Sequence, residues 1–289
     1  MSKLEHILIA YGSNIAYQNG AKYQILKNWS KWYSRKDISV CVLTDRPELF
    51  DGYPIRILEL TPEMKTKWSL NGLQHFGIKL RGIHHVMATS ACNIGILLDT
   101  DAYWTQDPCN LLQKINKNTI VMHSDEGRVS KSRNLSIRRF EEGLLGKVLD
   151  LKNKSKYQLA PNSRMLNSRV LGISQDNLEL LEFAYDLFTN IEPLVDAHTV
   201  EQYSVSEAAR INGFTVQFAK GSVADWSSTG RKNYVSPIIN EFFFGTNNRK
   251  FNELVKQLHE IDLSKVIEIT DVTARQDELA CAAGNCEIA

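Results

Sequence analysis

A five-residue apolar run, Ile94–Leu98, leads directly into Asp99, Thr100 and Asp101. A strand this apolar is expected to be buried on both faces, as in α/β proteins. Because side chains alternate along an extended chain, Asp99 and Asp101 should project to the same side. Two carboxylates held this close repel each other unless a cation lies between them. The pattern predicts a Mg²⁺ or Mn²⁺ site for a nucleotide or phosphate, with a solvated turn as the alternative.

Strand-length apolar segments alternate with helical patterns along most of the chain, which predicts a mostly parallel sheet flanked by helices. The expected strands are residues 7–10, 38–43, 55–60, 94–98, 119–122, 165–173 and 214–218. The expected helices are residues 21–32, 77–90, 111–115, 136–149, 177–189, 200–211, 238–244 and 251–259. With no linker or repeat, the sequence predicts one domain over residues 1–270 and a flexible tail over 271–289.

The composition narrows the class of partner. The 34 Lys and Arg residues nearly balance 33 Asp and Glu residues, which gives no electrostatic case for a nucleic-acid partner. No apolar stretch approaches the ~20 residues needed to cross a bilayer, and the first residues lack a signal-peptide pattern. Five scattered cysteines indicate free thiols in a reducing compartment. We expect a cytoplasmic enzyme.

Several short motifs follow one another in a particular order. They are ILIAYG at 7–12 with Tyr17, VLTD at 42–45, Lys79 and Arg81, LLDTD at 97–101 with Asp107 and Pro108, MLNSRVLGI at 165–173, and TVEQY at 199–203. The ordered set resembles the GT-A-fold nucleotide-sugar glycosyltransferases, especially the family 8-like retaining enzymes. The resemblance implies a GT-A (Rossmann-like) sheet and transfer of a sugar, with retention, from a nucleoside diphosphate to a glycan or other hydroxyl acceptor. UDP is the expected nucleotide.

The same resemblance implies roles for individual residues. Asp99, Asp101 and Asp225 would be the ligands of Mn²⁺ or Mg²⁺, and Asp101, Gln202 and Glu201 would lie at the reacting centre. The implied donor-binding residues are Tyr11, Gly12, Tyr17, Thr44, Asp45, Lys79, Arg81, Asp99, Thr100, Asn167, Arg231 and Lys232. An ordinary structural role is the alternative for most of them: packing for the tyrosines, turn residues for Thr44 and Asp45, exposed charges for Arg231 and Lys232, and a helix cap and a surface amide for Glu201 and Gln202.

Two positions depart from the family pattern. Arg169 stands where the family strand usually has Gly, and Asp225 stands near the place of a metal-binding His. Asp225 can supply an oxygen ligand for a hard cation, or it can be a solvated loop residue or a cap. The loops over residues 126–164 are the expected place of acceptor recognition. Asp125 or Glu126, which follow the strand expected at 119–122, would line the cleft toward the acceptor or form a surface turn.

Two other functions remain open. One is a degenerate GT-A domain that binds a sugar nucleotide without turnover, which the departures at Arg169 and Asp225 favour. The other is a haloacid-dehalogenase-like phosphatase that uses Asp99 and Asp101. That motif normally continues with Thr or Val where this chain has Tyr103, and it normally follows the first strand.

Overall fold

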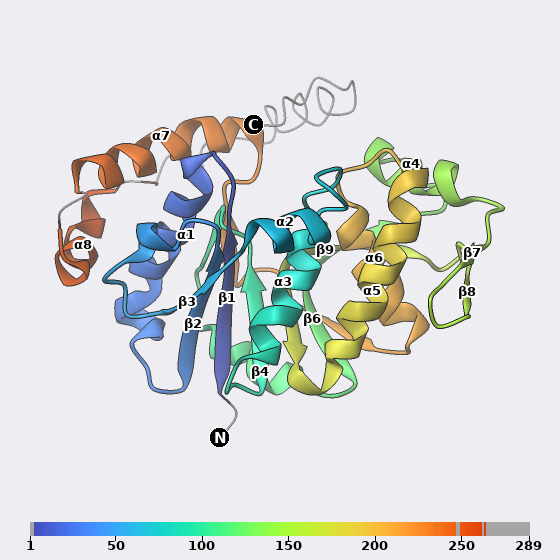
Figure 1. Cartoon of the computed structure of the whole chain (residues 1–289), viewed down its shortest axis with the longest axis horizontal. Helices are drawn as coiled ribbons and strands as arrows, with labels where there is room; N and C mark the ends of the chain where they lie inside the picture. Colours follow the sequence, from blue (N-terminus) through green and yellow to red (C-terminus); the bar gives the residue numbers. More distant parts are fainter. Residues whose placement is uncertain (1–2, 247–248, 262, 264–289) are drawn as a thin grey trace. The chain divides into compact units, whose positions relative to one another are not determined.

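A computed structural model of the chain describes residues 3–246, 249–261 and 263. Two compact units divide these residues. Unit 1 contains residues 3–7, 60–97 and 109–220, and unit 2 contains the rest. Figure 1 shows the course of the chain and the labels of its elements.

A seven-stranded sheet runs in the order β10-β6-β9-β4-β1-β2-β3. Its strands are β1 (Leu4–Ala10), β2 (Ile38–Thr44), β3 (Arg56–Glu59), β4 (Ile94–Leu98), β6 (Thr119–Arg128), β9 (Arg164–Ser174) and β10 (Thr215–Phe218). Two further two-stranded sheets pair β5 (Ala102–Trp104) with β11 (Val223–Asp225), and β7 (Leu149–Asp150) with β8 (Lys156–Tyr157). The pairs β1/β4, β2/β3 and β6/β10 are parallel, whereas β6 and β9 are antiparallel. The prediction of a mostly parallel α/β sheet is therefore confirmed.

Helices accompany the strands, as the alternating pattern predicts. They are α1 (Ile15–Asn28), α2 (Pro62–Trp68), α3 (Gly77–Ala88), α4 (Leu135–Leu144), α5 (Leu178–Ile191), α6 (Val200–Ile211), α7 (Thr229–Gly245) and α8 (Phe251–Gln257). The segment Pro108–Lys114, part of which was expected to be α-helical, is a 3₁₀ helix. No helix in the described part of the chain has both the length and the apolar character that a membrane span requires.

In unit 1, α3, α5 and α6 form a packed layer in which α5 contacts both of the other helices and α6 contacts β9 (Figure 1). Ile83, Leu181 and Val205 are fully buried in this layer or expose 1% of their surface. Burial of side chains of this size stabilises a fold by about 1.5–3 kcal/mol each relative to exposure. The layer gives the polar residues on α3, α6 and β9 a fixed scaffold.

In unit 2, helix α1 packs against α7 and against the short strand β5. Asn14 caps α1 by accepting a hydrogen bond from the Ala16 amide, which explains why the helix begins well before the predicted residue 21. Tyr23 on α1 makes edge-on ring contacts with Tyr103 and Trp226. These aromatic contacts secure β5 and β11, which pair in antiparallel fashion next to the Asp-rich turn.

Candidate functional site

The turn after β4 carries Asp99, Thr100 and Asp101, as predicted, and helix α1 holds it in place. The Gln24 side chain donates a hydrogen bond to the Asp99 carbonyl at 2.6 Å, and Gln24 is fully buried. Gly20 faces the same turn so closely that a Cβ there would lie 2.3 Å from the Thr100 carbonyl oxygen. The backbone of the acidic turn is thus set by two residues of α1.

Asp101 forms an ion pair with a residue of the predicted donor set. The Lys232 ammonium lies 3.2 Å from the Asp101 carboxylate, with the two side chains 42% and 21% exposed. Lys232 lies in the first turn of α7, which Ser228 caps by accepting from the Arg231 amide. An acid and a base partly open to solvent at the end of a buried strand can both exchange their partner for a ligand.

Asp225 also lies beside the acidic turn, on β11. It pairs in register with Ala102, and the next residue, Trp226, donates its amide to the Asp101 carbonyl at 2.9 Å. One carboxylate oxygen of Asp225 accepts hydrogen bonds from the Ser227 amide and hydroxyl, at 3.2 and 2.7 Å. These are the contacts of a loop-turn residue, whereas the cap of α7 is Ser228.

The chemistry of these carboxylates fits a hard cation, although they do not form a complete cage. Within the described ranges, no group of three or more His, Cys, Asp or Glu side chains is placed to hold a metal ion. Mg²⁺ usually takes only one or two carboxylates from the protein and completes its shell with water and substrate phosphates. A site formed by Asp101 with Asp99 or Asp225 would be of this type, in which the protein supplies only part of the coordination shell.

The loop after β1 is fastened to the end of β2. Both carboxylate oxygens of Asp45 accept from the Gly12 amide at 3.2 Å, and Gln18 donates to the Gly12 carbonyl at 3.1 Å. Gly12 has φ +97°, a conformation that favours glycine. Thr44 is fully buried and its hydroxyl accepts from the Arg46 amide, which is the role of a turn residue. Asp45 thus orders a glycine loop at the carboxyl end of a parallel sheet, where open α/β folds bind ligands.

The two tyrosines of this loop differ in exposure. Tyr17 is 37% exposed near the start of α1, and Tyr11 is half-buried. The Tyr17 ring therefore has surface available to a planar ligand.

In unit 1, the predicted residues Lys79, Glu201 and Gln202 converge on β9. The Lys79 ammonium lies 3.3 Å from the Glu201 carboxylate, and the Ser168 hydroxyl lies 3.0 Å from Lys79 and donates to Glu201 at 2.7 Å. Glu201 is 3% exposed. Its partners are a buried cation and a hydroxyl, so it is more than the helix cap considered from sequence.

Glu126 links two predicted donor-sugar residues. Its carboxylate accepts from the Asn167 amide at 2.7 Å and from the Gln202 amide at 2.9 Å. The Gln202 oxygen in turn accepts from the Ser168 amide at 3.3 Å. Because both amide groups donate to one carboxylate, their orientation is fixed and a polar, hydrogen-bonding cluster results.

Sequence reasoning missed Ser168, which joins both parts of this cluster. The available signal was its position on a strand of alternating character, directly after Asn167 and before Arg169. Arg169, which stands where the family has Gly, is half-buried with its guanidinium 3.3 Å from the His123 ring, and the Arg169 amide donates to the Asn167 side chain.

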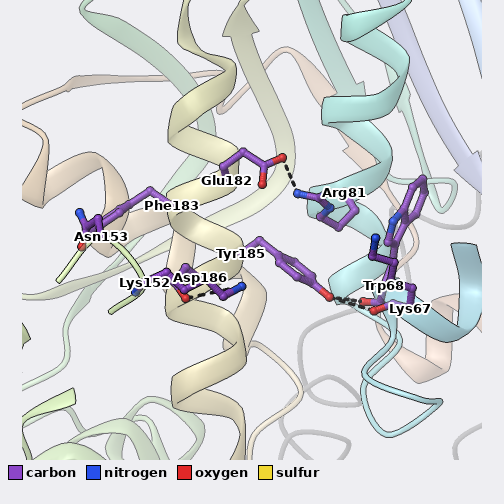
Figure 2. Close-up of a pocket in the computed structure, with 9 residues that line it drawn as sticks. All are labelled: Lys67, Trp68, Arg81, Lys152, Asn153, Glu182, Phe183, Tyr185 and Asp186. Atoms are coloured by element: carbon purple, nitrogen blue, oxygen red, sulfur yellow. Dashed lines mark hydrogen bonds and ion pairs between the residues drawn. The ribbon is translucent and has the colours of Figure 1, made fainter. Parts of the chain in front are cut away.

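Arg81 is not joined to Lys79. Figure 2 shows it facing Glu182 and Tyr185 of α5, in a pocket of about 400 Å³. Arg81 pairs with Glu182, and its guanidinium lies 5.2 Å from the centre of the Tyr185 ring. The other residues that line this pocket are Lys67, Trp68, Lys152, Asn153, Phe183 and Asp186. Two positions apart on a helix, Lys79 and Arg81 point to different sides.

Comparison of the sequence with known proteins assigns the chain to no family. No protein-family model matches the chain, and no curated protein matches its sequence.

Proposed function

We propose that the chain is a metal-dependent glycosyltransferase with a GT-A fold. It would transfer a sugar from a nucleoside diphosphate, with UDP as the first nucleotide to test, to a glycan or other hydroxyl acceptor, with retention of configuration. The observation that carries the proposal is the acidic turn at the end of β4, whose Asp101 pairs with Lys232 at 3.2 Å. A carboxylate and an ammonium together suit a metal-bound diphosphate.

The proposal assigns the nucleotide to residues of unit 2. Asp101, with Asp99 or Asp225, would hold Mn²⁺ or Mg²⁺, and Lys232 and Arg231 would bind phosphate oxygens. The loop of Tyr11 and Gly12, ordered by Asp45, would receive the base and ribose. The metal would neutralise the negative charge that develops on the departing nucleoside diphosphate.

The polar cluster of unit 1, taken by itself, has the hydrogen-bonding groups that a sugar ligand needs. Sugar hydroxyls need hydrogen-bond partners of both kinds, and the cluster offers amide donors on Asn167 and Gln202 and acceptors on Glu126 and Glu201. Lys79 offsets the negative charge of Glu201. A carboxylate and an amide near the anomeric carbon would stabilise the positive charge that develops there.

A cytoplasmic location is part of the same proposal. The cysteines that the structure describes, Cys41, Cys92 and Cys109, are not joined in disulfides. This agrees with the reducing compartment expected from sequence.

The deciding experiment is calorimetric titration of UDP and of GDP, with and without Mn²⁺. The proteins are the wild type, the variant Asp101→Asn and the control variant Asp107→Asn. In the wild type, Asp107 forms an ion pair with Arg35 at 2.5 Å. We expect Mn²⁺-dependent binding of one nucleotide, lost in Asp101→Asn and kept in Asp107→Asn. Absence of nucleotide binding in the wild type would overturn the proposal.

A second readout separates an enzyme from a binding module. Incubation of the matching nucleotide sugar with Mn²⁺ should release free sugar slowly, even without an acceptor. Nucleotide binding without such hydrolysis, and without transfer of the sugar to any acceptor tested, would identify the degenerate domain. Hydrolysis of simple phosphate monoesters without nucleotide binding would identify the phosphatase.

A further inference from the structure

Residues 128–156 of unit 1 concentrate positive charge in a chain that is nearly neutral. This segment, here called the basic lobe, holds nine Lys and Arg residues against three Asp and Glu residues, whereas the whole chain has a net charge of +1. It contains α4 and the hairpin of β7 and β8, which lie at the same end of unit 1 in Figure 1. Its charge is therefore a local property.

Most of these charges face solvent without a partner. Three basic residues of the lobe have an acidic neighbour: Arg138 pairs with Glu142, Arg139 with Asp196, and Lys152 with Asp186. The others form no ion pair within the described part of the chain and are exposed: Arg128, Lys131, Arg133, Lys147, Lys154 and Lys156. A cluster of exposed like charges costs stability through repulsion and attracts anions.

Large apolar side chains stand among these charges. Leu145 is 70% exposed, Val148 is 53% exposed and Leu135 is 49% exposed. Leu145 and Val148 flank Lys147 in the link between α4 and β7, and Leu135 lies between Arg133 and Arg138. Exposure of apolar side chains to water is unfavourable. Basic and apolar side chains side by side are favoured at a boundary where anionic groups cover an apolar layer.

Helix α4 of the lobe is packed into unit 1. Ile137, Phe140 and Leu144 bury one face of α4, each exposing 2% of its surface or less. Gly143 permits close approach to the Leu194 carbonyl, 2.5 Å from where a Cβ would lie. The exposed basic and apolar residues therefore lie on α4, or in segments near it in the chain, and the inner face of α4 is already packed.

We propose that the basic lobe binds the surface of a membrane that contains anionic lipids. Lys and Arg residues would lie at the headgroups, and Leu145 and Val148 would insert at the headgroup boundary. The exposed apolar residues favour a membrane over a soluble polyanion, which offers no apolar interior. This inference is independent of the proposed transferase activity.

The test is co-sedimentation of the full chain with vesicles of phosphatidylcholine alone and with phosphatidylglycerol added. We expect binding only to the anionic vesicles, weakened by salt. The triple variant Lys147→Gln, Lys154→Gln and Lys156→Gln should bind about 100-fold more weakly, since each basic residue near such a surface contributes about fivefold. The double variant Leu145→Ser and Val148→Ser should bind about tenfold more weakly at unchanged charge.

A charge-matched control is available among lysines outside the lobe. Lys36→Gln, Lys114→Gln and Lys117→Gln remove three exposed charges and should leave vesicle binding within about twofold. Equal losses in the two triple variants, or no binding of the wild type to anionic vesicles, would overturn the proposal. Full release by a soluble polysulfate, with no effect of the Leu145 and Val148 changes, would also overturn it and indicate a soluble polyanionic partner. Circular dichroism and urea unfolding confirm that each variant is folded.

Discussion

The Lys79 ammonium and the Glu201 carboxylate lie 3.3 Å apart, with side chains only 13% and 4% exposed. A buried pair of this kind contributes little net stability, but loss of one partner is costly because the other charge stays buried. The Ser168 hydroxyl satisfies part of the hydrogen-bonding capacity of both groups. The pair thereby fixes α6 to α3 at the start of the helix that carries Gln202.

Lys79→Met should lower the free energy of unfolding by about 3–5 kcal/mol, because Glu201 would lose its cation while remaining buried. The double variant Lys79→Met, Glu201→Gln should recover most of that loss. Urea unfolding of the wild type, both single variants and the double variant measures the coupling. Additive effects would show that the two side chains do not interact in solution.

Glu126→Gln should reduce turnover while leaving folding and nucleotide binding intact. The Asn167 and Gln202 amides donate to different oxygens of the Glu126 carboxylate, and a glutamine replaces one of these oxygens with an NH₂ group that donates instead of accepting. We expect kcat to fall about 10- to 100-fold and the free energy of unfolding to change by less than about 1 kcal/mol. The neighbouring Asp125→Asn, which breaks the pair with Arg164, is the control and should keep its kcat. Equal kcat values for the wild type and Glu126→Gln would remove Glu126 from the proposed sugar site.

Gly20→Ala should disturb the acidic turn by direct contact from α1. The new methyl group would lie 2.3 Å from the Thr100 carbonyl, so α1 or the turn must move. We expect a loss of about 1–3 kcal/mol in stability and weaker Mn²⁺-dependent nucleotide binding. Gly245→Ala, where a Cβ meets nothing within 4 Å, is the matched helical control and should change stability by less than about 1 kcal/mol. Nucleotide affinity that is unchanged in Gly20→Ala would show that the turn adapts.

Stability should fall steeply in alkaline solution because two tyrosines, Tyr203 of α6 and Tyr157 of β8, are buried. The hydroxyls of Tyr157 and Tyr203 lie 2.6 Å apart beside the buried Glu207. Burial, reinforced by the Glu207 charge, holds the pKa of both phenols well above the ordinary value. The unfolded chain releases these protons first, so their contribution is present below about pH 10 and is lost as the pH rises further.

Tyr203→Phe removes one of these groups and should make the decline in stability above pH 10 shallower by up to about 1.4 kcal/mol per pH unit. Urea unfolding between pH 8 and about pH 11 gives the slope. An unchanged slope would mean that Tyr203 ionises equally in the folded and unfolded chain.

Local patterns predicted the buried elements well. The limits of β4 and α6 agree with the expected residues 94–98 and 200–211, because continuous apolar runs and helical spacing mark buried elements strongly. Strand β6 extends six residues beyond the expected 119–122, since its outer half is polar and owes its extended form to pairing with β9. Helix α2 went unrecognised because it has only seven residues, although Thr61 and Pro62 supply the cap and first-turn signals.

The candidate site was predictable only in part. The acidic turn follows from its own sequence, whereas the contact of Asp101 with Lys232 joins residues far apart in the chain and depends on tertiary structure. The same holds for Lys79 and Glu201, and for Glu126 with Gln202. Helix geometry separated Arg81 from Lys79, although the two are neighbours in the motif. The predicted flexible tail over residues 271–289, which contains Cys281 and Cys286, lies outside the described residues.

The concentration of charge in residues 128–156 has a consequence for handling the protein. A chain with a sequence pI near 7.6 should pass through a cation exchanger at pH 8 if its charges were spread evenly. This segment carries a surplus of six positive charges, so the charge of the protein is unevenly distributed. An ion exchanger binds a protein through the part of its surface that contacts the resin. The protein should therefore be retained at pH 8 and elute with salt, so purification itself would display the asymmetry of its surface.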